Sequence, residues 1–174
     1  NKGQTVLIEA LGRVLKKCPY VKALIVGDGP QRQELEGQTQ NLGISKNVIF
    51  TGVRRDIPML LRVSDVFALC SIEREGMSVA LIEAMWAGLP LIGTRIGGTS
   101  ELVKSGVNGF LILPRQQDEL ADVIIKLAED RALTEKMGQL SRKIYEQNFM
   151  DRTMISNIEK LYHECLNEKI DDTV

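Results

Sequence analysis

The sequence predicts an α/β fold in which helices cover both faces of a doubly wound parallel sheet. Helical and strand-like segments alternate along the chain, which is the order that a parallel sheet requires. The strand-like segments are continuous apolar runs rather than apolar and polar residues in alternation, as expected for strands buried on both faces. The 174 residues suit one domain, and 44% of them are hydrophobic, which is enough for a substantial core.

Five short apolar runs, bounded by glycine, proline or polar residues, predict the strands. They span residues 21–26, 47–51, 65–71, 90–94 and 109–113. The first run leads into Gly27 and the second into Gly52, as is typical of turns that follow a strand.

Helices are predicted around these strands, mainly from apolar residues at spacings of three, four and seven. They span residues 4–17, 30–42, a short segment after Asp56, 78–87, a short segment entered through 97–101, and then 118–128, 133–148 and 151–166. Pro30 at a first helical position and Asp56 as an N-cap mark two of the starts. The result is a Rossmann-like domain over residues 1–166, followed by a tail, 167–174, that we expect to be frayed.

Composition excludes several classes of function. The net charge of −1 provides no bulk attraction to nucleic acid or to acidic membranes. Cys18, Cys70 and Cys165 are far apart and in no metal-binding spacing, so they indicate free or buried thiols in a reducing compartment. Within these 174 residues we find no signal-peptide pattern, long apolar run or lipidation motif. The chain begins at Asn1 and enters a helical pattern almost at once, so we expect a fragment whose preceding part is missing.

Three loops that follow predicted strands carry unusual residues, at 27–29, 75–78 and 97–101. Ligands of open parallel sheets bind at the carboxyl ends of the strands, and all three loops are predicted to share that edge. This coincidence is a stronger signal than any one of the loops taken alone.

Gly27 and Gly29 do not complete a dinucleotide-binding fingerprint. The third glycine of that motif is replaced by Arg32, and Pro30 interrupts the turn. Two interpretations remain open. The glycines form a strand-to-helix turn that needs positive φ, or they are small so that a ligand can lie against the backbone.

Glu75 and Glu83 lie eight positions apart on either side of a predicted helix start at Ser78. Glu83 is surrounded in sequence by apolar residues, so its carboxylate is expected to need a polar partner. That partner is either the backbone N–H groups of residues 97–99 or two neighbouring hydroxyls of a ligand. A helix start with free N–H groups and two carboxylates beside it predicts a site for a phosphorylated polyol.

Lys2 and Arg54 are the basic residues predicted at the same edge. Each is interpreted either as an ordinary solvated side chain or as a counter-charge for phosphate. The single histidine, His163, lies in the last helix and is expected to be structural or exposed. The sequence contains no Ser/His/Asp arrangement, Walker loop or metal-ligand cluster, so no metal site is predicted.

An ordered set of motifs carries a resemblance that covers the chain to about Phe149. The motifs are Lys2-Gly3, Gly27-Asp28-Gly29-Pro30, Glu75-x7-Glu83, Ala84-Met85-x-Ala87-Gly88-x-Pro90, Gly97-Gly98-x-x-Glu101 and Gly106-x-Asn108-Gly109-Phe110. Together they resemble the C-terminal, nucleotide-sugar-binding domain of retaining GT-B glycosyltransferases of the family 4 kind (glycosyl transferases group 1). The resemblance implies one half of a GT-B fold, and transfer of a sugar from a nucleoside diphosphate to an acceptor hydroxyl with retention.

The resemblance implies two catalytic residues and a set of binding residues. Glu75 would contact the hydroxyls of the donor sugar near the reacting centre, and Lys2 would neutralise the diphosphate. Glu83 would bind the ribose hydroxyls. Backbone N–H groups of the segment Gly76, Met77, Ser78 and Val79 would face the diphosphate and the sugar.

At the base end, the resemblance implies that Gly27 and Gly29 allow close approach of the nucleotide, and that Val53 and Arg54 line the base largely through their backbone. Two departures from the family pattern are Met77, where Phe is more usual, and Ser78, where Gly is common. Both are expected to tune the choice of sugar.

The resemblance also implies the surroundings of the site. The donor is a nucleoside diphosphate sugar bound without a metal or other cofactor, and nucleic acid is not a partner. An N-terminal acceptor domain and an arginine before Lys2 would lie outside these residues, so the chain alone is expected to bind donor without turnover. The full-length protein is expected in the cytoplasm, with peripheral association at the inner face of a membrane. Two alternatives stay open, namely a sugar-nucleotide epimerase of GT-B architecture and a non-catalytic nucleotide-binding module.

Overall fold

The computed structural model confirms the α/β fold with parallel strands. It describes the backbone of residues 2–171, with side chains in that range except at 151 and 167–171. The strands are β1 (Ala23–Val26), β2 (Val48–Gly52), β3 (Phe67–Leu69), β4 (Leu91–Thr94) and β5 (Gly109–Ile112). The helices are α1 (Gln4–Lys17), α2 (Arg32–Asn41), α3 (Ile57–Arg62), α4 (Val79–Trp86), α5 (Thr99–Leu102), α6 (Gln117–Glu129), α7 (Arg131–Asn148) and α8 (Asp151–Asp171).

The five strands are divided between two parallel sheets rather than joined in one. β1 pairs with β2, and β4 lies between β3 and β5. In the larger sheet Leu91 is the register partner of both Phe67 and Gly109. β3 contributes three residues to its ladder with β4 and lies at the edge of the larger sheet.

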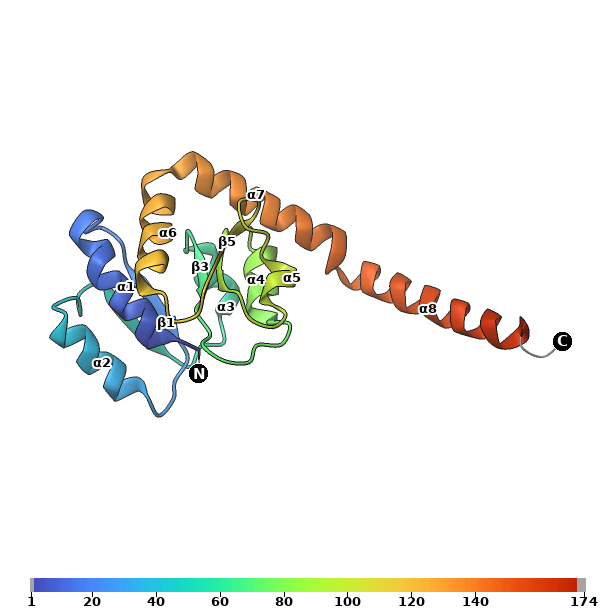
Figure 1. Cartoon of the computed structure of the whole chain (residues 1–174), viewed down its shortest axis with the longest axis horizontal. Helices are drawn as coiled ribbons and strands as arrows, with labels where there is room; N and C mark the ends of the chain where they lie inside the picture. Colours follow the sequence, from blue (N-terminus) through green and yellow to red (C-terminus); the bar gives the residue numbers. More distant parts are fainter. Residues whose placement is uncertain (1, 172–174) are drawn as a thin grey trace.

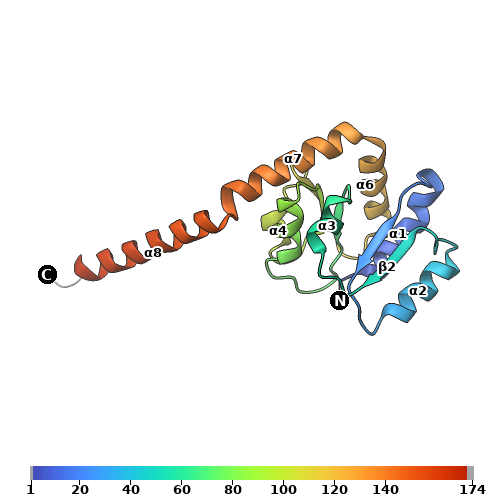
Figure 2. The same cartoon turned by 180° about the vertical axis from the view of Figure 1, so that it is seen from behind.

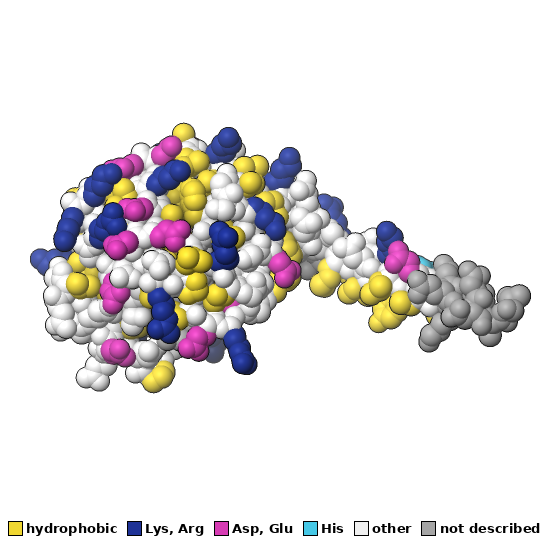
Figure 3. All heavy atoms as spheres, in the orientation of Figure 1, with side chains coloured by type: hydrophobic (Ala, Val, Ile, Leu, Met, Phe, Trp, Pro, Cys, Tyr) yellow, Lys and Arg dark blue, Asp and Glu magenta, His cyan; other side chains and the backbone are white. Residues whose placement is uncertain are grey.

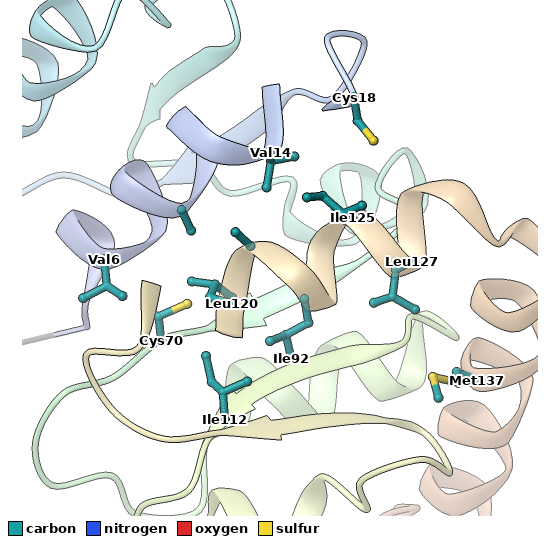
Figure 4. Close-up of a cluster of buried hydrophobic side chains, with 12 residues drawn as sticks. Val6, Val14, Cys18, Cys70, Ile92, Ile112, Leu120, Ile125, Leu127 and Met137 are labelled. Atoms are coloured by element: carbon teal, nitrogen blue, oxygen red, sulfur yellow. The ribbon is translucent and has the colours of Figure 1, made fainter. Parts of the chain in front are cut away.

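Helices cover both faces of the larger sheet, as predicted. Leu91 and Ile92 are adjacent in β4 and fully buried, yet they belong to different core clusters. Ile92 packs with α1 and α6 in the cluster of Figure 4, and Leu91 packs with α3, α4 and α5 on the other face. Successive strand residues point to opposite faces, so this division is direct evidence of a sheet covered on both sides.

Helix α1 connects the two sheets through its two apolar sides. Val6, Ala10 and Val14 belong to the cluster on the larger sheet. Ile8 and Leu11 are as deeply buried, but they pack in a separate cluster with α2 and β2. The start of α1 is thereby held at the edge where both sheets end, as Figures 1 and 2 show for the beginning of the chain.

Several predicted element boundaries and one predicted helix cap differ from the structure. The second helix begins at Arg32 rather than at Pro30, which lies in the preceding turn. Asp56 does stand at the N-cap of α3, but its carboxylate does not cap the helix because it binds Arg54 instead. The last helix continues to Asp171, past its predicted end at Leu166, while residues 172–174 of the expected frayed tail lie outside the described residues.

Helix α8 projects from the body of the molecule, as Figures 1 and 2 show. Its apolar side chains are exposed and recur at helical spacing, so they form one stripe, visible in yellow in Figure 3. The stripe consists of Met154, Ile155, Ile158, Leu161, Tyr162 and Leu166. No helix in the described part of the chain has the length and hydropathy needed to cross a membrane.

Candidate functional site

The loops that follow β3 and β4 pack against each other backbone to backbone. The N–H group of Gly98 donates to the carbonyl oxygen of Glu75 at 3.1 Å. Gly97 has a φ of +46°, and a Cβ atom there would lie 1.7 Å from that same oxygen. The two glycines therefore fix the path of the Glu75 loop, and two of the three loops predicted to share an edge are in contact.

The start of the chain packs against the end of β3 and delivers Lys2 to this loop. A Cβ atom on Gly3, which has a φ of +70°, would lie 1.9 Å from the carbonyl oxygen of Cys70. Nζ of Lys2 donates to both carboxylate oxygens of Glu75, at 2.9 Å each. The Glu75 side chain is only 8% exposed, while that of Lys2 is 57% exposed. The pair thus combines a fixed acid with a cation that has room to move.

The hydroxyl of Ser71 also donates to Oε2 of Glu75. Burial raises the pKa of the Glu75 carboxyl, but the hydrogen bonds from Ser71 and Lys2 and the charge of Lys2 lower it by more. The pKa therefore lies below its usual value, and Glu75 is ionised at neutral pH. An ionised carboxylate in this position is a hydrogen-bond acceptor for ligand hydroxyls.

The start of α4 follows directly after Glu75. Ser78 is the N-cap residue and makes no side-chain cap, so the first N–H groups of α4 are left for other partners. Ser78 is buried, whereas Met77 and Val79 on either side of it are exposed. A Cβ atom on Gly76 would meet no atom within 4 Å, so the space beside this segment is open. This is the geometry of an anion site at a helix start.

Glu83 is exposed, so the expectation that its carboxylate would be desolvated inside an apolar helix is wrong. The buried residues of α4 are Leu81, Ala84 and Met85, and Glu83 lies off that stripe. Its side chain makes no hydrogen bond or ion pair with any residue that the structure describes. The proposed structural bond to the loop at 97–99 is absent there, because that loop binds the backbone of Glu75 instead.

Gly27 and Gly29 lie at the end of the smaller sheet. Gly27 has a φ of +113°, and its N–H group donates to the carbonyl oxygen of Gly52 at 2.9 Å. The turn interpretation is therefore confirmed for Gly27. A Cβ atom on Gly27 or Gly29 would meet nothing within 4 Å, so the surface of this turn is also open.

Val53 and Arg54 follow β2. Val53 is 79% exposed. The guanidinium of Arg54 binds the carboxylate of Asp56 in a two-point pair, with distances of 2.8 Å from Nε and 2.5 Å from Nη2. The hydrogen bond from Arg54 lowers the pKa of Asp56. The Arg54 side chain is therefore already engaged, which agrees with the expectation that this loop acts through its backbone.

Sequence reasoning missed Ser71 and Thr94. Both are almost fully buried, and the hydroxyl of Thr94 donates to the carbonyl oxygen of Ser71 at 2.7 Å. Their one sequence signal is a hydroxyl residue at the end of an apolar strand, which is common in turns. Among the residues that the structure describes, no group of three or more His, Cys, Asp and Glu side chains is placed to hold a metal ion.

Comparison with known proteins identifies the family. The model for glycosyl transferases group 1 matches residues 1–144. The chain belongs to the glycosyl transferases group 1 family. Among curated relatives, N-acetyl-alpha-D-glucosaminyl L-malate synthase of Bacillus anthracis is 32% identical over 162 residues, covering 93% of this chain and 42% of the relative. The chain therefore spans less than half the length of this family member.

Solved structures agree with this placement. The crystal structure of Anabaena Alr3699/HepE in complex with UDP is 35% identical with a TM-score of 0.87, covering 94% of this chain and 45% of that one. The same protein has been solved with UDP-glucose. The C-terminal domain of the glycosyl transferase group 1 protein LpcC from Francisella tularensis is 28% identical with a TM-score of 0.80, covering 86% of this chain and 80% of that domain. The group 1 chain thus has the fold of one half of a GT-B glycosyltransferase.

Proposed function

We propose that this chain is the nucleotide-sugar donor-binding domain of a retaining glycosyltransferase, which moves a sugar from a nucleoside diphosphate sugar to an acceptor hydroxyl. The observation that carries the proposal is the position of ionised Glu75. It lies between the cation of Lys2 and the open start of α4. Alr3699/HepE, which shares this fold at 35% identity, was solved with UDP and with UDP-glucose.

Two carboxylates, those of Glu83 and Glu75, orient the donor along α4 by binding different parts of it. Glu83, exposed and without a protein partner among the described residues, accepts hydrogen bonds from the two ribose hydroxyls. Glu75, fixed at the start of the helix, accepts from hydroxyls of the sugar. The diphosphate lies between them, against the N–H groups of Met77, Ser78 and Val79.

The catalytic residues of the proposal are Lys2 and Glu75. When the bond from the sugar to the diphosphate breaks, negative charge grows on the diphosphate and positive charge on the sugar. Lys2 and the start of α4 stabilise the first, and the Glu75 carboxylate stabilises the second. These groups supply the charges that the transfer needs, so we expect the donor to bind without a divalent metal.

The base and the acceptor are held by other surfaces. The turns at Gly27–Gly29 and Val53–Arg54 present open backbone at the end of the smaller sheet, and the base is proposed to lie there. The acceptor is proposed to bind to a preceding domain of a longer chain. The exposed apolar stripe of α8 supports such a domain, because proteins usually bury an apolar surface of this kind against a partner. A cytoplasmic location, with peripheral attachment to the inner face of a membrane, belongs to the same proposal.

Calorimetric titration of the chain with UDP, GDP and ADP tests the donor role through Glu83. The wild-type chain is expected to bind at least one of them in the millimolar range or tighter. Glu83→Ala is expected to weaken that binding by roughly 10- to 100-fold, because hydrogen bonds to a charged group are lost. Glu159→Ala removes another exposed helical carboxylate, from α8, and is expected to leave nucleotide affinity unchanged. Equal affinity in Glu83→Ala and wild type would overturn the ribose assignment.

A further inference from the structure

Ser71 is a buried donor aimed at the central carboxylate of the site. It lies just beyond β3, is 1% exposed, and its hydroxyl donates to Oε2 of Glu75. A buried hydroxyl in contact with an ionised carboxylate stabilises the charged form and restricts the rotation of the acid.

Ser71 is held in position by the larger sheet rather than by the loop that contains Glu75. Its carbonyl oxygen accepts a hydrogen bond from the hydroxyl of Thr94, at the end of β4, at 2.7 Å. Thr94 is itself 1% exposed. The Ser71 hydroxyl is therefore held where two neighbouring, buried strands of the larger sheet end.

The second partner of Glu75, Lys2, differs from Ser71 in charge, in exposure and in the segment that carries it. The Lys2 side chain is 57% exposed and belongs to the segment before α1. A diphosphate carries more negative charge than one carboxylate, so we expect its arrival at the start of α4 to draw Lys2 away from Glu75. Glu75 would then stay buried without its cation, a state in which burial favours protonation.

We propose that Ser71 is the positioning residue for Glu75, holding the carboxylate in place and ionised when Lys2 turns to the diphosphate. This inference deepens the proposed function and rests on it for the arrival of the diphosphate. The Gly97–Gly98 turn holds the backbone of Glu75, and Ser71 holds its side chain. Among the described residues, Lys2 is the charged group in hydrogen-bond contact with Glu75, and Ser71 and the glycine turn contribute neutral groups.

The test is an NMR titration of the Glu75 carboxyl carbon, assigned by its loss in Glu75→Gln. Ser71→Ala is expected to increase the proton affinity of Glu75 by about tenfold. The increase is expected to be larger when Lys2→Met is also present, since this variant imitates the departure of the lysine. Ser71→Thr keeps the hydroxyl and is expected to restore the wild-type titration. Ser64→Ala, which removes a hydroxyl bonded to Leu60 outside the site, is expected to have no effect.

An unchanged Glu75 titration in Ser71→Ala, with and without Lys2→Met, would overturn the inference. If Ser71→Ala does not fold, Ser71→Cys replaces it. A thiol has nearly the same volume as the hydroxyl but donates a weaker hydrogen bond, so the proton affinity of Glu75 is again expected to rise. The same variants are titrated with UDP, GDP and ADP. If wild type binds none of them, the proposed function fails. The effect of Ser71 on the protonation of Glu75 is still tested by the carboxyl titration. Nucleotide affinity in Ser71→Ala within about threefold of wild type is expected, because Ser71 acts on the sugar end alone.

Discussion

Glu75→Gln is expected to slow sugar transfer by the full-length protein strongly and yet to strengthen its binding of nucleoside diphosphate. Transfer is expected to fall by about 10²- to 10³-fold, the cost of removing one preorganised electrostatic contact. Nucleotide affinity is expected to rise by about two- to fivefold, because the exposed Lys2 side chain no longer has to leave its ion pair with Glu75 to reach the diphosphate. Opposite changes in rate and affinity separate this account from simple damage to the site.

The measurements are turnover of donor by the full-length protein and calorimetric titration of the same variant with the nucleotide that wild type binds. Glu73→Gln is the matched control, since Glu73 is exposed in the same loop. It is expected to behave as wild type. If Glu75→Gln kept normal turnover, or lost nucleotide affinity in proportion to its rate, the assigned role of Glu75 would be wrong.

Gly97→Ala is expected to be the most destabilising of the small substitutions near the site. Its Cβ atom would lie 1.7 Å from the carbonyl oxygen of Glu75, and its φ of +46° is unfavourable for alanine. The left-handed backbone and the forced shift of the loop together are expected to lower the free energy of unfolding by about 2–4 kcal/mol. The same shift moves Glu75 away from Ser71 and Lys2.

Urea unfolding of this chain measures the effect. Gly37→Ala in α2 is the control, because a Cβ atom there would meet nothing within 4 Å. Inside a helix that substitution is expected to stabilise by about 0.5–1 kcal/mol. A loss of stability in Gly97→Ala no greater than about 0.5 kcal/mol would mean that the two loops are not held together as described.

The parts of the fold that local pattern determines could be predicted from the sequence. Continuous apolar runs gave all five strands, and glycines near their ends gave the turns, because these depend on a few neighbouring residues. The shared edge of the Glu75 loop and Gly97–Gly98 was expected because parallel strands end at one edge, and the structure adds their direct contact. The assignment of Glu75 and Lys2 to one place followed from that edge and from the family resemblance.

Features that depend on distant packing could not be predicted in this way. The exposure of Glu83 depends on which side of α4 meets α7 and the larger sheet, and the apolar run of α4 does not reveal this. The division into two sheets depends on which strands come close enough to pair, and the apolar runs do not reveal this. The role of Ser71 was hidden because a serine after a strand is ordinary, and only its contact with Glu75 gives it meaning.

Mapping of backbone amide shifts by NMR, as nucleotide is added to the chain, tests the donor-binding claim most directly. UDP, GDP or ADP at millimolar concentration is expected to shift the amides of Met77, Ser78 and Val79 together with those of Gly27–Gly29 and Val53. Glu83→Ala is expected to reduce these shifts at equal nucleotide concentration. No shifts with any of the three nucleotides, or shifts confined to α6 and α7, would contradict the claim that this edge holds a nucleotide-sugar donor.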